Sequence, residues 1–406
     1  MNLKYSALDW KLILAALVLS FIGIMLIMSA QHNADTEYQR DYYLRQSLWL
    51  AVAFIIFAVI VHIPPKLFDM MAYVMYGISI LLLVLVLFVG SAKMGASRWF
   101  SFGSMNFAPS DFAKVAVLFA LSRFLAYTKL PVASKRRMAI TAIITIIPVA
   151  LILKQPDLGT SLVFLVLLFI LWFWAGLSPI YLLLIVSPIF SLIAASHWLA
   201  WSIYIVVLLI FLFISKPGII FGIAAVVTNL VSGIMTPIMW SRLADYQKLR
   251  ILTFLDPGRD PRGAGYQIIQ SKIAIGSGGV FGKGFLNGSQ TRLDFLPEPH
   301  TDFIFSVLGE EFGLIGALFV LLLFTFIFYR SIKIASHCRS RFASLVVMGA
   351  AGIIMFQFLV NIGMTLGFMP VTGLPLPFVS YGGTSLVLFW ALIGLIVSAE
   401  ARWQEY

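Results

Sequence analysis

Residues 12–30 read LILAALVLSFIGIMLIMSA, an apolar run without a single charge. A helix needs roughly 20 apolar residues to cross a bilayer, and it satisfies its own backbone hydrogen bonds where water is absent. Similar runs recur to the C-terminus, and the chain is 61% hydrophobic and 11% charged, whereas soluble domains are roughly 25% charged. We therefore predict an all-α integral membrane protein, a polytopic helical bundle of about 10–12 transmembrane helices.

The first run follows Lys4 and Lys11, so a cleaved signal peptide is an alternative interpretation. The run is longer than a typical signal-peptide core, and no small-x-small cleavage pattern dominates its end. We interpret it as a retained first helix.

Apolar runs predict the positions of the individual spans. They lie near 12–30, 47–63, 71–90, 111–127, 138–153, 159–176, 179–196, 198–215, 218–239, 302–329, 344–367 and 381–399. Neighbouring runs are hardest to separate between Gly176 and Trp240. A polar stretch from about 241 to 301 interrupts the series and predicts a large loop.

Basic residues predict the orientation. With a cytoplasmic N-terminus, the cytoplasmic connections hold about 13 Lys and Arg, and the opposite short loops hold about 5. Both termini are then cytoplasmic, and the 241–301 loop is extracytoplasmic. The net charge of +11 reflects this bias rather than nucleic-acid binding. Residues 1–406 are expected to form a single transmembrane domain whose polar clusters gather on the outer face.

The outer loop carries many ionisable residues and a glycine-rich run, Gly276–Gly284. Glycine lets backbone approach a ligand closely, and exposed N–H groups can hold an anion. Together with Lys272 and Lys283, the run suits a diphosphate. A flexible turn with solvated charges explains the spacing equally well.

The loop ends in PEPHTDFIF, residues 297–305, where the chain re-enters the membrane. A carboxylate at the mouth of a span is unfavourable unless it is paired, hydrated or used in function. Asp302 is therefore a candidate catalytic group, with Glu298 and His300 beside it. The alternative is an early-turn acid that complements the helix dipole.

Asp111 and Lys114 lie three residues apart at the outer start of a predicted span, so they share a helix face and can pair. Ser110 fits the N-cap of that helix. Pairing for stability is the simpler interpretation, and contact of Lys114 with a phosphate is the functional one.

Two further outer segments carry polar candidates. Arg98 and Trp99 stand together near the interface, where tryptophan commonly anchors a protein in the membrane. Gln155 and Asp157 belong to a short outer turn. Each pair is conspicuous only because the predicted topology places it on the same face as Asp302.

Metal and nucleotide motifs are missing from the sequence. The histidines form no His-x-x-x-His pair, and there is no phosphate-binding loop, so no nucleotide cofactor is expected. A divalent cation, Mg²⁺ or Mn²⁺, is left open because such ions use few protein ligands and several phosphate oxygens. Glu310 and Glu311, inside a predicted span, should face protein or water rather than lipid.

Three separated segments resemble the SEDS family, the membrane glycosyltransferases of bacterial shape, elongation, division and sporulation. The longest, residues 254–316, runs from FLDPGRDPRGAGYQ to EEFGLIG and is similar to the family's extracytoplasmic loop and next helix. KQPDLGTS at 154–161 and GLPLPFVSYGGTS at 373–385 match two more signatures. GKGFLNGSQTRLDFLPE at 282–298 is more similar to the elongation members (RodA) than to the division members (FtsW). The resemblance covers most of the chain apart from about 178–240.

The resemblance implies an enzyme that polymerises lipid II, an undecaprenyl diphosphate-linked disaccharide peptide, in the bacterial cytoplasmic membrane. It also implies a class B penicillin-binding protein and the elongation machinery as partners. It places the proposed catalytic carboxylate on Asp302. The residues predicted to bind substrate are Arg98, Trp99, Asp111, Lys114, Gln155, Asp157, Lys272, Lys283, Glu298, His300 and Ser385.

Two departures from the family's usual pattern are visible. Ala108, Pro109, Ser110 and Asp111 replace a typical Gln-Pro-Ser-Glu, so the shorter Asp111 puts the exact carboxylate reach in doubt. The family usually has ten spans, so one helical pair between residues 176 and 240 looks like an addition. Adding two helices preserves the orientation of everything after them.

We hypothesise inverting glycosyl transfer, with Asp302 as general base toward the acceptor hydroxyl. Basic residues and a divalent cation would stabilise the departing undecaprenyl diphosphate. A lipid II flippase is the chief alternative, and a non-catalytic scaffold for the penicillin-binding protein is another. A flippase needs access from both faces, whereas the polar candidates here crowd the outer one.

Overall fold

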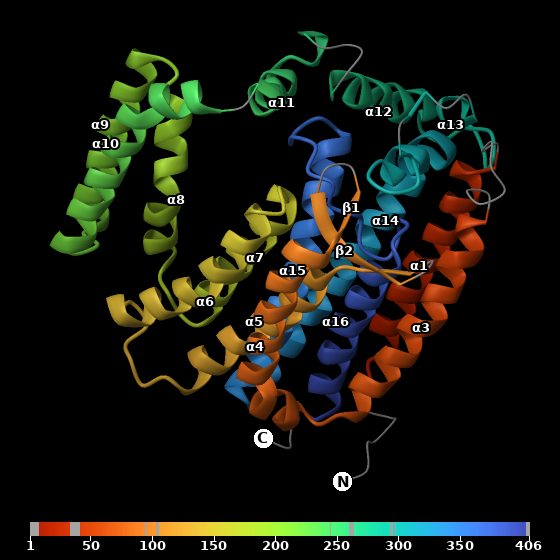
Figure 1. The fold of residues 1–406 in the computed structure, drawn as a ribbon, viewed down its shortest axis with the longest axis horizontal. Coiled ribbons are helices and arrows are strands. Elements are labelled where there is room, and N and C mark those ends of the chain that lie inside the picture. Colours follow the sequence, from red (N-terminus) through yellow and green to blue (C-terminus); the bar gives the residue numbers. More distant parts are fainter. Residues whose placement is uncertain are drawn as a thin grey trace.

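The computed structural model describes residues 8–32, 41–93, 96–102, 105–243, 245–259, 264–292, 295–296 and 298–402. These residues form a bundle of long helices (Figure 1). The bundle has two distinct ends: α1 starts and α16 ends at one of them, and α11, α12 and α13 lie across the other (Figure 1).

The predicted spans correspond one to one with long helices of the described residues. They are α1 (Trp10–Ala30), α3 (Tyr42–His62), α4 (Pro65–Val89), α5 (Pro109–Tyr127), α6 (Lys135–Leu153), α7 (Leu158–Trp174), α8 (Pro179–Ala194), α9 (Trp198–Ser215), α10 (Ile219–Arg242), α14 (Ile304–His337), α15 (Arg341–Thr365) and α16 (Gly383–Ala401). Within the described residues, 9 helices are long and apolar enough to cross a membrane. The chain is a multi-pass membrane protein.

The core lies around α15 and α16, because 78% and 72% of their spanning windows are buried inside the protein. Large side chains fill it, among them Trp390, Phe164 and Phe324. The Trp390 indole donates to the Ser20 hydroxyl at 3.2 Å and so joins α16 to α1. Burial on all sides explains why these spans are apolar around their whole circumference.

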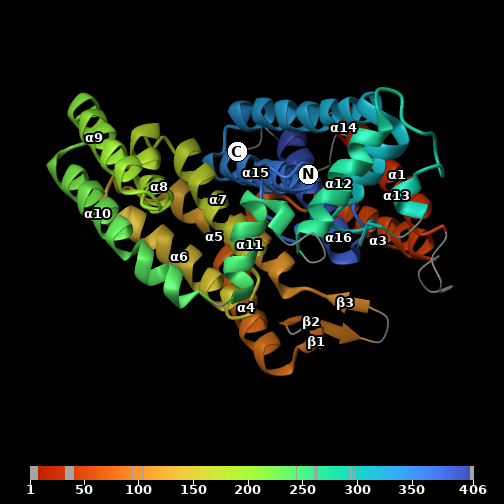
Figure 2. The same ribbon diagram turned by 90° about the horizontal axis from the view of Figure 1, so that it is seen from above.

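Helices α8, α9 and α10 form a satellite unit at one side of the bundle (Figures 1 and 2). Leu184, Leu208 and Ala225 make its small apolar core. Only 6% of the α9 window and 17% of the α10 window are buried. Their exposed apolar faces suit contact with lipid rather than with water.

A small sheet interrupts the otherwise helical fold, and the sequence analysis missed it. Strands β1 (Ser91–Lys93), β2 (Ala96–Phe102) and β3 (Met105–Phe107) pair antiparallel in the order β1-β2-β3. Figure 2 shows the sheet projecting beside α4. Strands β1 and β3 hold three residues each, too few for a recognisable alternation of polar and apolar side chains.

The polar stretch at 241–301 connects α10 to α14 and holds helices of its own. It contains α11 (Asp245–Leu255), a 3₁₀ turn (Pro257–Arg259), α12 (Ala264–Gly278) and the short α13 (Ser289–Arg292). Helix α12 packs along α14 and reaches the end of α15. The stretch is therefore a layer of helices over one end of the bundle.

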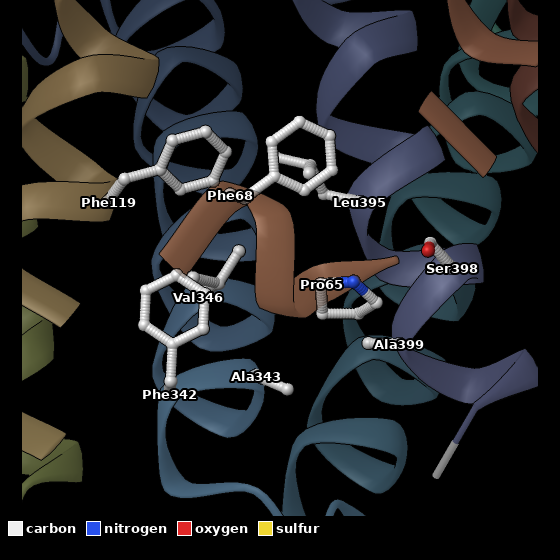
Figure 3. A pocket seen from close by; sticks show the side chains of 9 residues that line it. All are labelled: Pro65, Phe68, Phe119, Phe342, Ala343, Val346, Leu395, Ser398 and Ala399. Atoms are coloured by element: carbon white, nitrogen blue, oxygen red, sulfur yellow. The ribbon is translucent and has the colours of Figure 1, made fainter. Parts of the chain in front are cut away.

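An apolar pocket lies near the end where α1 starts, between α4, α5, α15 and α16 (Figure 3). Phe68, Phe119, Phe342 and Leu395 line it, and Ser398 is its only polar side chain. The pocket offers no ionisable group, and it lies at the opposite end of the bundle from Asp302.

Candidate functional site

The backbone before α14 is held by three donors at three successive carbonyls. The Tyr381 N–H donates to the His300 oxygen at 2.9 Å, and the Ser380 hydroxyl donates to the Thr301 oxygen at 2.6 Å. The Asn361 amide donates to the Asp302 oxygen at 3.0 Å. Residues 300–302 are therefore clamped against α15 and the segment that precedes α16.

The Asp302 carboxylate accepts no hydrogen bond from the described residues, although the backbone on which it sits is fixed. It is partly buried, and a β-carbon at Gly373 would stand 3.7 Å from its Oδ2. Burial, and after it the negative charge of Glu298, raises the pKa of Asp302 from 3.8 to about 6. A carboxyl group with this pKa can exchange a proton near neutral pH.

His300, two residues before Asp302 in the chain, lies in a ring cluster with Tyr42 and Tyr381. The two tyrosine rings stack with centroids 4.5 Å apart, and the imidazole packs 5.0 Å from Tyr42. The Gln31 amide nitrogen lies 2.8 Å from His300 Nδ1. Because an amide nitrogen only donates, Nε2 carries the imidazole hydrogen and points at Glu298 Oε2, 3.5 Å away. Burial lowers the pKa of His300 to about 4, so the ring is neutral.

The turn before α7 brings together three other predicted residues. The Arg98 guanidinium donates to the Gln155 carbonyl at 3.1 Å and lies 3.7 Å from Asp157 Oδ2. Asp157 also caps α7 by accepting from the Thr160 N–H at 3.0 Å. Asp157 therefore has a structural role, and Arg98 fastens β2 to the same turn. Trp99 follows Arg98 on β2 and is partly exposed.

The Asp157 turn and Asp302 flank the same short segment, residues 372–374. A β-carbon at Gly159 would lie 2.6 Å from the Thr372 oxygen, so α7 touches this segment on one side. The Asp302 carboxylate approaches Gly373 of the same segment. The sequence signatures at 154–161 and 373–385 thus meet next to the Asp302 segment.

Asp111 and Lys114 form a buried ion pair, with Lys114 Nζ 2.8 Å from Asp111 Oδ1. Lys114 is only 4% exposed, so the pair is a part of the α5 packing. The predicted Ser110 cap is wrong: Ala108 is the N-cap residue, and Pro109 opens the helix. Pro109 fixes φ in the helical range and lacks an N–H that would need a cap.

Lys283 pairs with an acid inside α14. Its Nζ lies 2.7 Å from Glu310 Oε1, and the same oxygen accepts from the Ser289 hydroxyl and the Gln290 N–H, each at 3.0 Å. Glu310 is fully buried, and a buried carboxylate is stable only with such partners. The neighbouring Glu311 accepts a hydrogen bond from the Ser29 hydroxyl of α1. Both acids face protein, as the sequence predicted.

The glycine-rich run packs backbone against backbone on α14. Helix α14 is interrupted at Gly313, where φ is 62° and ψ is −158°. The Leu314 N–H that this break frees donates to the Gly279 oxygen at 3.0 Å. A β-carbon at Gly278 or Gly282 would lie 2.0 or 2.1 Å from α14 carbonyl oxygens. The flexible-turn reading is therefore wrong, and the described backbone of the run faces α14 in close packing.

Lys272 and Ser385 are two further predicted site residues, and both are accessible to solvent. Lys272 is exposed on α12, and its Nζ would lie 2.6 Å from a β-carbon at Gly367, just past the end of α15. The preceding residue, Ser271, shares a 2.7 Å hydrogen bond with Ser306, one turn after Asp302. Ser385 is partly exposed in the first turn of α16.

Sequence reasoning missed several residues that build this site. Asn361 interrupts an apolar span and Gln31 directly follows one, and a lone amide at such a place was an available signal. Ser380 and Tyr381 lie inside a recognised signature, but their bonds to the backbone of 300–301 are not encoded in the local pattern. Tyr42 could not have been linked to His300 without the fold.

Among the described residues, no three His, Cys, Asp or Glu side chains are close enough to hold a metal ion together. Asp302 and Glu298 are near enough for one charge to affect the other. These two carboxylates do not form a cage for a resident metal, so a hard cation here would take its ligands from phosphate and water.

These features define a class: a polytopic helical membrane protein with a clamped carboxylate, near-neutral in pKa, at one end of the bundle. A family model described as "Cell cycle protein", covering FtsW, RodA and SpoVE, matches residues 9–204 and 199–405. The chain belongs to this family. The two matched stretches meet in α9, inside the satellite unit.

Named relatives and a solved structure agree with this assignment. The chain is 39% identical over 355 residues to "Peptidoglycan glycosyltransferase MrdB" of Escherichia coli (strain K12), which covers 87% of this chain and 84% of that protein. It is 34% identical over 428 residues to "Peptidoglycan glycosyltransferase RodA" of Treponema pallidum (strain Nichols), which covers 98% of each.

The structural match has a TM-score of 0.73 at 32% identity and covers 98% of this chain and 99% of the other. It comes from work described as "Structural coordination of polymerization and crosslinking by a peptidoglycan synthase complex". The agreement extends over essentially the whole chain.

Proposed function

We propose that this chain is a peptidoglycan glycosyltransferase that polymerises lipid II into glycan strands during cell elongation, with Asp302 as general base. The acceptor hydroxyl gives its proton to the Asp302 carboxylate while its oxygen forms a bond to the anomeric carbon of the donor. The bond from that carbon to undecaprenyl diphosphate breaks, and the diphosphate leaves as an anion. Family membership and the names of the relatives support this reaction class.

One observation carries the role of Asp302. Its backbone is held by Asn361, and the preceding carbonyls are held by Ser380 and Tyr381. Its carboxylate nevertheless stays without a hydrogen bond among the described residues, with a pKa of about 6. A base that is fixed in place, unpaired and near-neutral is what proton abstraction from a sugar hydroxyl requires.

Lys272 is the strongest candidate for contact with the diphosphate. Lys114 and Lys283 are held by carboxylates, and Arg98 is held by the Asp157 turn. Lys272 has no ion pair among the described residues and stands exposed next to Ser271, which touches the first turn of α14. An exposed ammonium can bind a phosphate without breaking an existing pair.

A divalent cation, Mg²⁺ or Mn²⁺, is proposed as a companion of the diphosphate. Phosphate oxygens and water would supply its ligands, which leaves the Asp302 carboxylate free to act as base. Such an ion would neutralise charge on the leaving group. No nucleotide is needed, because the lipid diphosphate is already an activated donor.

Location and partners follow from the same proposal. We place the protein in the bacterial cytoplasmic membrane, with the Asp302 end and the α11–α13 layer outside and both termini inside. The solved peptidoglycan synthase complex supports a crosslinking partner, which we propose to be a class B penicillin-binding protein of the elongation machinery. A flippase or scaffold role is left as an outcome of the experiment below.

The test uses purified full-length protein in liposomes with fluorescent lipid II, with and without the penicillin-binding partner. Wild type should produce polymer, and Asp302→Asn, which keeps the side-chain shape, should lower the rate by about 10²- to 10⁴-fold. Asp245→Asn, an exposed acid of α11, is the matched control and should polymerise normally. Near-normal polymer from Asp302→Asn would remove the general-base role.

Translocation of labelled lipid II without polymer would favour the flippase. Absence of both would favour the scaffold. Lys272→Met should raise the lipid II concentration at half-maximal rate by about tenfold, as expected for loss of one charge-assisted hydrogen bond. Lys248→Met, at a lysine paired with Asp245 on α11, is its control.

A further inference from the structure

Helix α15 presents two buried amides on one face, one turn apart. Gln357 and Asn361 are both 0% exposed, and residues four apart on a helix point the same way. Their bonding is very different. The Asn361 Nδ2 donates to the Asp302 oxygen at 3.0 Å and to the Leu374 oxygen at 2.9 Å, so both of its hydrogens are used. Neither polar atom of Gln357 has a partner among the described residues.

Asn361 therefore joins two chain segments that meet at the Asp302 carboxylate. One of them carries Asp302 itself. The other contains Gly373, whose φ of 72° lets the chain turn beside the carboxylate. A side chain that lacked the paired amide hydrogens could not hold both carbonyls at once.

We propose that Asn361 is a positioning residue: its amide fixes the backbone of Asp302 against the Gly373–Leu374 turn and so sets where the carboxylate points. It touches neither substrate nor reacting atoms. This inference rests on the proposed function, because it gives Asp302 its geometry for proton abstraction. Small displacements of a positioned base lower the rate strongly.

The backbone position that Asn361 gives to Asp302 also controls how far the carboxylate is exposed to water. Clamped at this site, Asp302 is partly buried and its pKa is raised. If Asn361 is replaced, the segment loosens and water reaches the carboxylate, so its pKa moves back toward 3.8. A purely structural role of Asn361 would lower the yield of folded protein without moving this value.

The experiment compares Asn361→Leu with Gln357→Leu in otherwise wild-type full-length protein. Gln357→Leu removes an unpartnered amide of the same face and should leave polymerisation unchanged. Asn361→Leu should lower the maximal rate by about 10- to 100-fold, with less than about a threefold change in half-saturating lipid II. The acid limb of its pH profile should move to lower pH. Asn361→Ser keeps one hydrogen-bond donor and should give an intermediate rate. It takes the place of Asn361→Leu in the comparison if that variant folds poorly.

A second readout does not depend on activity. Carbodiimide labelling of Asp302 against pH, quantified by mass spectrometry, should show a midpoint near pH 6 in wild type and a lower midpoint in Asn361→Leu. Unchanged midpoint and unchanged rate in the folded Asn361 variants would overturn the inference. If wild type makes no polymer, the proposed function fails, and the labelling still decides whether Asn361 positions the carboxylate.

Discussion

The Asp302 region and the satellite unit each contain a buried asparagine, but the hydrogen bonds of the two regions draw on very different stretches of chain. Asn361 reaches Asp302, 59 residues away, and its neighbour Gln31 in the same region reaches His300 across 269 residues. In the satellite unit, Asn229 bonds Ser187 across 42 residues and accepts from Tyr204 across 25. One region is assembled from the whole chain, whereas the other is complete within α8–α10.

The difference shows two uses of buried polar groups. In the satellite unit, interhelical hydrogen bonds hold a local cluster whose outer surface suits lipid. Around Asp302, bonds from α1, α15 and the segment before α16 converge on a few residues and leave one carboxylate unbonded. Disturbing the converging region should therefore cost more stability than disturbing the local one.

The largest expected effect is at Lys283. Lys283→Met leaves the buried Glu310 without its cation, and breaking a buried pair typically costs about 3 to 5 kcal/mol. Thermal unfolding in detergent, followed by tryptophan fluorescence, measures the loss. Lys248→Met disrupts the α11 surface pair with Asp245, whose side chain is fully exposed, and should leave the melting temperature unchanged. Equal melting of both variants would contradict the role assigned to the buried pair.

The next effect is at the break in α14. Gly313→Ala forces a side chain into a left-handed backbone, and its β-carbon would lie 2.4 Å from the Gly282 nitrogen. A loss of about 1 to 3 kcal/mol is expected. Gly222→Ala in α10 is the contrast, because nothing lies within 4 Å of its β-carbon. That change should be neutral or stabilising by up to about 1 kcal/mol. A destabilised Gly222→Ala would show that the satellite unit is more tightly packed than its burial indicates.

Asp302 should be a source of instability above pH 6. Its folded pKa of about 6 lies above the ordinary 3.8, so the folded protein binds the proton more tightly and ionisation destabilises it. The destabilisation grows between pH 4 and pH 6 and is level at higher pH. Asp302→Asn should be more stable than wild type at pH 7.5 by about 1 to 2 kcal/mol. The gain should vanish near pH 4, and a gain independent of pH would point to another cause.

The smallest effect is expected at Asn229. Asn229→Leu removes the bonds to Ser187 and Tyr204, and an interhelical hydrogen bond in a membrane protein is worth about 1 kcal/mol. The melting temperature should fall slightly, and lipid II polymerisation should be unchanged. A variant that folds but does not polymerise would show that the satellite unit acts on the Asp302 region.

Long apolar runs made the spans predictable, because hydrophobicity and length alone decide whether a helix can cross a membrane. Their ends were less predictable. Helix α14 extends to His337 rather than to about 329, since Arg330 is accommodated by an ion pair with Asp9 at 2.6 Å. The sheet at 91–107 and the helices at 245–292 were missed because short strands and mixed helices give weak periodic signals.

The candidate site was predictable only in part. Asp302, Glu298 and His300 adjoin one another in both sequence and structure. The partners of the cationic candidates could not be read from the chain, because Lys283 meets Glu310 through the fold. The glycine-rich run signalled close backbone approach correctly, but whether the approach is to a ligand or to α14 depends on tertiary contacts. The roles assigned to the site residues stay predictions.

The docking of the 278–284 segment on α14 has a consequence for biogenesis. During translation this segment leaves the ribosome about 30 residues before Gly313 does, so its binding surface does not yet exist when the segment is made. The layer of α11, α12 and α13 can close only after α14 has been inserted into the membrane and Glu310 has met Lys283. Maturation of the Asp302 end is therefore timed by the insertion of a late helix, and a chain stalled before that step would leave this end of the bundle open.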